Sequence, residues 1–155
     1  MRYSIDTSAL IAAYREHYSP DVFPDVWDFM GQLAEDEVLG ASEVVLQELQ
    51  QRDDELLKWA RQNRQMFRAT DDTIQYEVEA ILSTHGALID EESDREQADP
   101  FVIALARIEG CAVVTTEKGT GNPAKPRIPD VSRDLGLQCT TPLGMFRAEG
   151  KVFRA

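Results

Sequence analysis

Short extended runs recur along the chain and predict the strands of a sheet. Residues 1–6 alternate apolar and polar positions as a half-buried strand does, and residues 37–41 are too few for a helix. Residues 111–115, CAVVT, are apolar throughout, as in a strand that is covered on both faces. Residues 66–69 and 137–140 form two more brief runs. We interpret all five segments as strands.

Apolar residues at spacings of three and four fill the segments between these runs. They predict a short helix over 9–14, a helix from Pro24, one long helix from Ser42 to beyond Ala60, and a helix capped by Asp71 or Asp72. The run FVIALARI, which Asp99 is expected to cap, is apolar nearly all round, so its helix is expected to be buried. Asp130 and Thr141 are expected to cap two further helices.

The alternation of strands and helices decides the fold class. A strand followed by a helix and then another strand is typical of a parallel sheet with helices on both faces. We therefore expect an α/β fold, a three-layer α/β/α sandwich with a mostly parallel central sheet. The length of 155 residues fits a single domain over 1–155.

Charge is distributed unevenly along the chain. The formal net charge is −12, which argues against general attraction to nucleic acid. From residue 111 onward, however, seven Lys or Arg face four Asp or Glu, so the first 110 residues carry a net −15. A polyanion is expected to approach the C-terminal part, or to come with metal ions, whereas a basic protein partner suits the remainder.

Three further features bear on surface and compartment. Arg61, Arg64 and Arg68 are expected to share a helix face, more simply as a solvated stripe than as a phosphate-binding strip. Residues 90–99 are strongly acidic and predict a solvated loop. Cys111 and Cys139 lack metal-ligand spacing and are expected to be core thiols.

The sequence shows neither a hydrophobic leader nor a run long enough to span a membrane. We therefore expect a reduced, cytoplasmic protein.

Four acidic residues stand where strands end or helices begin. Asp6 follows the first strand, Asp99 precedes the buried helix, and Glu117 follows the strand CAVVT. Glu48 has Val44, Val45 and Leu49 as neighbours on its predicted helix, which favours an inward carboxylate. Since the carboxyl ends of parallel strands share one edge of the sheet, we expect these four acids to converge there.

Each of these acids also has a simpler interpretation. Asp6 and Asp99 could serve only as helix caps, and Glu117 could be an ordinary loop residue. Glu48 could form an exposed pair with Arg52. If the four do converge, their repulsion calls for a cation, and Mg²⁺ or Mn²⁺ prefers such oxygen ligands. A metal of this kind can bind a phosphodiester and activate water, which predicts hydrolysis of nucleic acid.

The sequence resembles the PIN domain, the fold of metal-dependent ribonucleases found in the toxins of VapBC-type toxin–antitoxin pairs. The matching segments are IDTSALI, VVLQEL, ADPFVIALA, AVVTTEKG and IPDVSRDLGLQC, which cover almost the whole chain in family order. The last segment is similar to a little-characterised PIN-like branch from bacteria and archaea.

The resemblance implies roles for particular residues. The metal-binding acids fall on Asp6, Glu48 and Asp99, and the fourth acid falls on Glu117, where the family usually has aspartate. The family hydroxyls fall on Thr7 or Ser8 and on Thr115. Apart from the resemblance, Lys118 could balance the acids or contact a phosphate, although an ordinary surface lysine is the simpler interpretation. The resemblance further implies Mg²⁺ or Mn²⁺ dependence, cleavage of single-stranded RNA, a homodimer, and a small antitoxin whose tail enters the acidic crevice.

Two other functions remain open at this point. A phosphoryl-transfer protein could use Asp6 as its phosphate acceptor, with Thr115 and Lys118 nearby, and it predicts covalent labelling of Asp6. A PIN-like module could also keep its acids for binding or scaffolding without cutting RNA. The unusual Glu117 and the acidic charge favour this second alternative somewhat.

Overall fold

A five-stranded, fully parallel sheet forms the centre of the computed structural model, which describes residues 1–52, 54–90 and 97–154. The strand order is β3-β2-β1-β4-β5. The strands are β1 (Tyr3–Ile5), β2 (Leu39–Ser42), β3 (Phe67–Arg68), β4 (Ala112–Val114) and β5 (Cys139–Thr140). All five predicted strands are confirmed, as is the parallel sheet.

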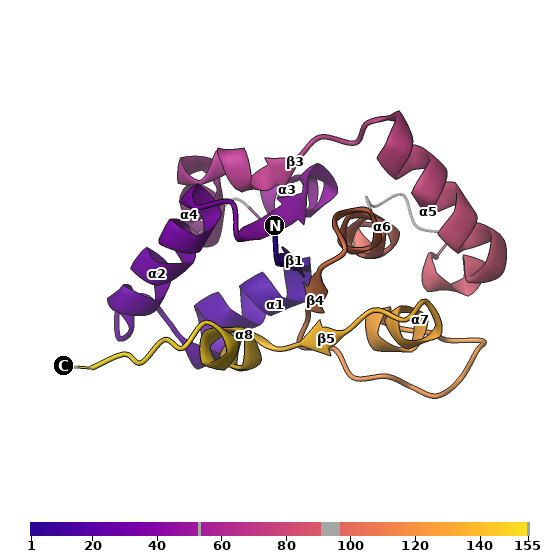
Figure 1. The fold of residues 1–155 in the computed structure, drawn as a ribbon. Helices are drawn as coiled ribbons and strands as arrows, with labels where there is room; N and C mark the ends of the chain where they lie inside the picture. Colours follow the sequence, from indigo (N-terminus) through magenta and orange to yellow (C-terminus); the bar gives the residue numbers. More distant parts are fainter. Residues whose placement is uncertain (53, 91–96, 155) are drawn as a thin grey trace.

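Helices cover both faces of this sheet, so the predicted three-layer sandwich is confirmed. Figure 1 shows α5, α6 and α7 on one side and α1, α2 and α8 on the other. Their bounds are α1 (Thr7–Ala12), α2 (Pro24–Glu35), α3 (Glu43–Gln50), α4 (Glu55–Gln62), α5 (Asp72–Thr84), α6 (Asp99–Glu109), α7 (Ile128–Asp134) and α8 (Pro142–Ala148). A π-helical turn, Ala13–His17, extends α1, and two 3₁₀ turns span Arg64–Met66 and Gly86–Leu88.

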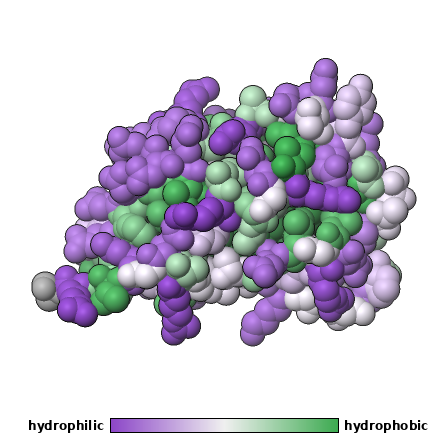
Figure 2. All heavy atoms as spheres, in the orientation of Figure 1, coloured by the Kyte–Doolittle hydropathy of each residue, from purple (hydrophilic) through white to green (hydrophobic). Residues whose placement is uncertain are grey.

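The apolar core fills the space between the sheet and these helices. Helix α6 packs on β1, β2 and β4, and its Ile103 and Leu105 are almost fully buried, as its apolar sequence predicts. The central strands contribute Ile5 and Val113, neither of which is exposed. On the face drawn in Figure 2, hydrophobic residues reach the surface in several separate areas between hydrophilic ones.

The strand order reverses between β1 and β4. The chain first builds outward from β1 to β2 and β3, then crosses to the other side for β4 and β5. The amide of Asp6 donates to the carbonyl of Val114 at 3.0 Å, so the two strands are still paired where they end. At such a reversal the connections leave on opposite faces and open a crevice at the carboxyl edge.

The single long helix expected after Ser42 is wrong, because two helices occupy that stretch. Helix α3 ends at Gln50, and the side chain of Asp54 caps α4 by accepting a 3.2 Å hydrogen bond from the amide of Leu57. The arginine stripe therefore does not share one face. Arg61 lies in α4, whereas Arg64 lies in a 3₁₀ turn and Arg68 in β3.

Two expected helix caps are also wrong. Asp99 is the first residue of α6, and Ala98 occupies the cap position without a side-chain hydrogen bond. Asp130 lies inside α7, whose cap residue is Arg127. Among the thiols, Cys111 is buried, but Cys139 is exposed because it lies on the edge strand β5.

The remaining expectations concern other parts of the chain. Most of the acidic segment 90–99, namely 91–96, lies outside the described residues. Within the residues that the structure describes, no helix combines the length and apolarity needed to cross a bilayer.

Candidate active site

A cleft of about 410 Å³ opens at the carboxyl edge of the sheet and contains three of the four predicted acids. Glu48 reaches it from α3, Asp99 from the start of α6, and Glu117 from the segment after β4. Its lining residues are Thr7, Ser8, Ile11, Glu48, Gln51, Arg52, Asp99 and Glu117. The acids are distant in sequence, so the parallel topology brings them together.

Asp6, the fourth acid, is buried behind this lining. Only 1% of the residue is exposed, and Ser8, which lines the cleft, donates to its carboxylate at 2.9–3.0 Å. The amide of Ala9 donates to Oδ1 at 2.7 Å, and Thr115 Oγ1 donates to Oδ2 at 2.6 Å. Burial raises the pKa of Asp6 to about 6, although these hydrogen bonds work in the opposite direction.

Asp99 is the most strongly perturbed carboxyl of the cleft. Burial raises its pKa to about 7, and the negative charges of Glu117, Asp6 and Glu48 contribute in the same direction. Because Asp99 does not cap α6 with its side chain, the carboxyl is left for the cleft. A buried carboxyl with a raised pKa in a cleft with other acids is typical of a functional site.

Glu48 points into the cleft, as its apolar neighbours predict. Thr7 Oγ1 donates a hydrogen bond to Glu48 Oε1. Burial raises the pKa of Glu48, whereas the bond from Thr7 and the positive charge of Arg52 lower it. In the described part of the chain Glu48 and Arg52 do not form the ion pair that was the simpler interpretation.

Glu117 is held at both ends. Its amide donates to Thr115 Oγ1 at 3.0 Å, and its Oε2 accepts a 3.3 Å hydrogen bond from the amide of Ile128 in the first turn of α7. Glu117 is therefore an ordered part of the cleft wall and not merely a loop residue. Lys118, by contrast, is exposed and does not line the cleft.

The hydroxyl residues divide between the acids. Sequence left the choice between Thr7 and Ser8 open, and the structure assigns each to a different carboxylate: Thr7 to Glu48 and Ser8 to Asp6. Thr115 serves two groups at once, because it donates to Asp6 and accepts from the amide of Glu117. These hydrogen bonds fix the orientation of the Asp6 and Glu48 carboxylates.

The donor atoms of the cleft are carboxylate and hydroxyl oxygens, which is the chemistry that Mg²⁺ or Mn²⁺ prefers. The arrangement is not closed around an ion, however. Among the described residues, no three His, Cys, Asp or Glu side chains approach closely enough to bind one ion together. Both oxygens of Asp6 already accept hydrogen bonds, and like charges keep uncompensated carboxylates apart. The donor set fits such a metal in kind, and the present spacing does not.

Asp130 is a structural residue of this region whose role the sequence did not reveal. Its carboxylate accepts hydrogen bonds from the amides of Thr120 at 3.0 Å, Gly121 at 3.1 Å and Arg127 at 2.8 Å. These bonds lower its pKa to about 2. Asp130 thereby ties the two arms of the loop after Glu117 together. A Cβ at Gly119 would lie 2.7 Å from Asp130 Oδ1, so this close approach needs glycine.

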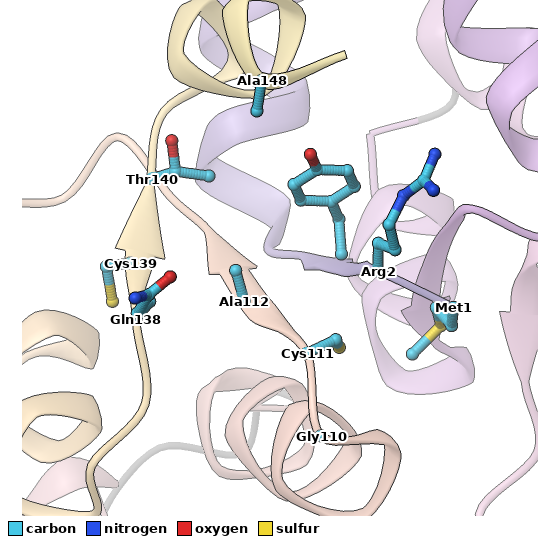
Figure 3. Close-up of a pocket in the computed structure, with 10 residues that line it drawn as sticks. Met1, Arg2, Gly110, Cys111, Ala112, Gln138, Cys139, Thr140 and Ala148 are labelled. Atoms are coloured by element: carbon cyan, nitrogen blue, oxygen red, sulfur yellow. The ribbon is translucent and has the colours of Figure 1, made fainter.

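A larger hollow, of about 700 Å³, lies at the opposite edge, where the strands begin. Figure 3 shows Arg2, Ala112 and Gln138 around it, close to the starts of β1, β4 and β5. None of its lining residues is Asp or Glu. This hollow therefore lacks the carboxylates that line the cleft at the carboxyl edge.

Comparisons with known proteins agree with this fold. The crystal structure of VapBC2 from Rickettsia felis, bound to a DNA fragment from their promoter, is similar over 91% of this chain and 98% of that chain, with a TM-score of 0.54 and 16% identity. At that identity the likeness shows a shared fold, in agreement with the sequence resemblance. The comparison with curated proteins gives no match. A family model described as a domain of unknown function, DUF4411, matches residues 3–153, and the chain therefore belongs to this family.

Proposed function

We propose that this protein is a metal-dependent endoribonuclease that hydrolyses phosphodiester bonds of single-stranded RNA. The observation that carries the proposal is the meeting of Glu48, Asp99 and Glu117 in one cleft, with Asp6 directly behind it, at the reversal of strand order. Asp6 also caps α1 through the amide of Ala9, and Glu117 accepts from the amide of Ile128, but these bonds do not account for the gathering of four acids from separate segments. Raised pKa values, as for Asp6, Glu48 and Asp99, are typical of functional sites.

In this proposal Asp6, Glu48, Asp99 and Glu117 would hold Mg²⁺ or Mn²⁺ once their carboxylates move closer together than they lie in the structure. When bound, the metal would supply neutralisation of the phosphate charge and an activated water. The protein's own residues orient the ligands. Thr115 and Ser8 hold Asp6, Thr7 holds Glu48, and the first turn of α7 holds Glu117 through Ile128. Asp99, whose pKa is raised to about 7, gains most from a nearby cation.

Cleavage of a labelled single-stranded RNA in Mg²⁺ tests the proposal. Asp6→Asn and Asp99→Asn are expected to abolish cleavage and to keep the circular dichroism spectrum of the native protein. Asp28→Asn changes an exposed acid of α2 that does not line the cleft, and it serves as the matched control. Full activity of both cleft variants would end the ribonuclease proposal.

We further propose that the protein is the toxin of a VapBC-type pair, acting in the cytoplasm as a homodimer with a small basic antitoxin. The net −15 of the first 110 residues and the likeness to VapBC2 support this proposal. A small basic protein should co-purify from the native host, and expression of the chain alone should slow growth. If neither happens, the toxin assignment fails, while the nuclease can stand.

A module that binds through its acids and does not cut RNA is the second candidate. It is favoured by the spacing of the acids, no three of which approach one ion position within the described residues. Metal titration followed in parallel with RNA cleavage separates the two, because this module binds metal without cleaving. A phosphoryl-transfer protein would be labelled covalently at Asp6 by a phosphodonor, whereas the proposed ribonuclease would not. No covalent labelling of Asp6 is therefore expected.

A further inference from the structure

Arg52 lines the acid-lined cleft, and Arg127 lies next to one of its walls, directly before Ile128, whose amide donates to Glu117. We propose that Arg52 and Arg127 are positioning residues that bind RNA phosphates beside the bond to be cut. This inference rests on the proposed function, because it gives that cleft its contacts to the substrate backbone. Four carboxylates repel a polyanion, so a nucleic-acid strand needs cationic side chains at the rim of such a site.

Arg52 lies one turn beyond Glu48, just after α3. Its amide donates to the carbonyl of Leu49 at 3.1 Å, which keeps its backbone next to the helix end. The residue is exposed and lines the cleft. Its positive charge lowers the pKa of Glu48, yet the two form no ion pair in the described structure.

Arg127 is the cap residue of α7 and lies in the sequence after the acids of the cleft. Its amide is fixed by Asp130 at 2.8 Å, and the amide of the next residue, Ile128, donates to Glu117. The backbone of Arg127 is thus pinned next to a wall of the cleft, while the residue itself is exposed.

Both guanidinium groups are available for a ligand, because neither forms an ion pair within the described residues. Several other described arginines, such as Arg61 and Arg147, are likewise without an ion pair, so position beside the acids is what distinguishes Arg52 and Arg127. A guanidinium presents a planar fork of donors that matches a phosphate, and lysine does not reproduce that fork.

RNA binding at several salt concentrations tests the inference. A fluorescent single-stranded RNA is titrated in Mg²⁺ with Asp99→Asn as the parent, so that cleavage does not interfere. Arg52→Ala and Arg127→Ala, added singly, should each raise Kd about 10-fold. Each should also make the negative slope of the logarithm of the association constant against the logarithm of the salt concentration less steep by about 0.7. The lysine variants should recover the slope but only part of the affinity. Arg147→Ala, an exposed arginine of α8 outside the cleft, should match the parent.

The outcomes separate this inference from the proposed function. Unchanged Kd and slope in the alanine variants, or no RNA binding by the parent at low salt, overturn the inference. Unchanged Kd and slope are also expected if the arginines only relieve repulsion among the acids. In that case the alanine variants would differ from the parent only by a lower melting temperature. If the wild-type protein does not cut RNA but the alanine variants lose affinity as described, the ribonuclease proposal fails and the phosphate contacts stand.

Discussion

Thr115 Oγ1 donates a 2.6 Å hydrogen bond to Asp6 Oδ2 and thereby joins the ends of β4 and β1 where the strand order reverses. The same hydroxyl accepts from the amide of Glu117 at 3.0 Å. One buried threonine thus sets the position of an acid after each of the two central strands. Its loss is expected to affect both acids at once.

Replacing Thr115 by valine keeps the shape of the side chain and removes this hydroxyl. The Asp6 carboxylate then loses a donor, which should cost about 1–3 kcal/mol of unfolding free energy at pH 8. Cleavage of RNA should fall about 10-fold, because Asp6 and Glu117 lose their common support. Urea unfolding and single-turnover cleavage measure the two effects. Thr73→Val, at an exposed position of α5, is the control. Wild-type values in both assays would contradict this role.

The acidic cleft should make the metal-free protein less stable as the pH rises. The pKa is raised to about 6 for Asp6 and about 7 for Asp99, while both lie near 4 in an unfolded chain. Between about pH 4 and 7 the folded protein therefore binds more protons, so the free energy of unfolding falls as pH increases through this window. Thermal melts in EDTA from pH 4.5 to 8 should show this fall.

Asp99→Asn isolates the contribution of the cleft to that pH dependence. Because the variant lacks the buried charge, its free energy of unfolding at pH 8 in EDTA should be about 2 kcal/mol higher than that of the wild type. This difference corresponds to a Tm higher by about 4–8 °C. The difference should vanish near pH 4.5, where the wild-type carboxyl is protonated. Saturating Mn²⁺ should raise the Tm of the wild type at pH 8 more than that of the variant. An Asp99→Asn protein that melts below the wild type at pH 8 in EDTA would refute this.

Asp130→Ala should loosen the loop between Glu117 and α7. The substitution removes the acceptor of three backbone amides, those of Thr120, Gly121 and Arg127. Limited proteolysis should then cut within 119–127 faster than in the wild type, and KM for RNA should rise more than kcat falls. The pKa of Asp130 is lowered to about 2, so its stabilising contribution should persist down to pH 4 and disappear toward pH 2. Asp28→Ala is the control, and equal proteolysis rates would reject the tie.

Much of the fold was predictable because its signals are local. Continuous apolar runs such as CAVVT and FVIALARI indicate buried elements whatever surrounds them, and β4 and α6 lie where these runs predict. The break between α3 and α4 was not predictable from periodicity, since Leu49 and Leu56 remain in register across it. The side chain of Asp54 caps α4 and thereby starts a new helix, whereas the sequence around Asp54 is compatible with one continuous helix or with two.

The meeting of the acids at one edge of the sheet was predictable, whereas the contacts that hold them were not. Position at strand ends and helix starts is enough to bring Glu48, Asp99 and Glu117 to one edge of the sheet. Which hydroxyl serves which carboxylate depends on side-chain directions that no spacing rule contains. Asp130 was predicted to cap α7 but lies inside this helix. Its carboxylate accepts from three backbone amides that precede the helix, and Gly119 is the one sequence feature that reflects this arrangement.

Binding of Mn²⁺ measured by isothermal titration calorimetry tests the central claim most directly, because it asks whether these four acids act together on one cation. The wild-type protein is predicted to bind Mn²⁺ at pH 7.5, Asp6→Asn and Asp99→Asn to bind it at least 10-fold more weakly, and Asp28→Asn to match the wild type. Equal affinity in all four proteins, or no binding by the wild type, would contradict the claim.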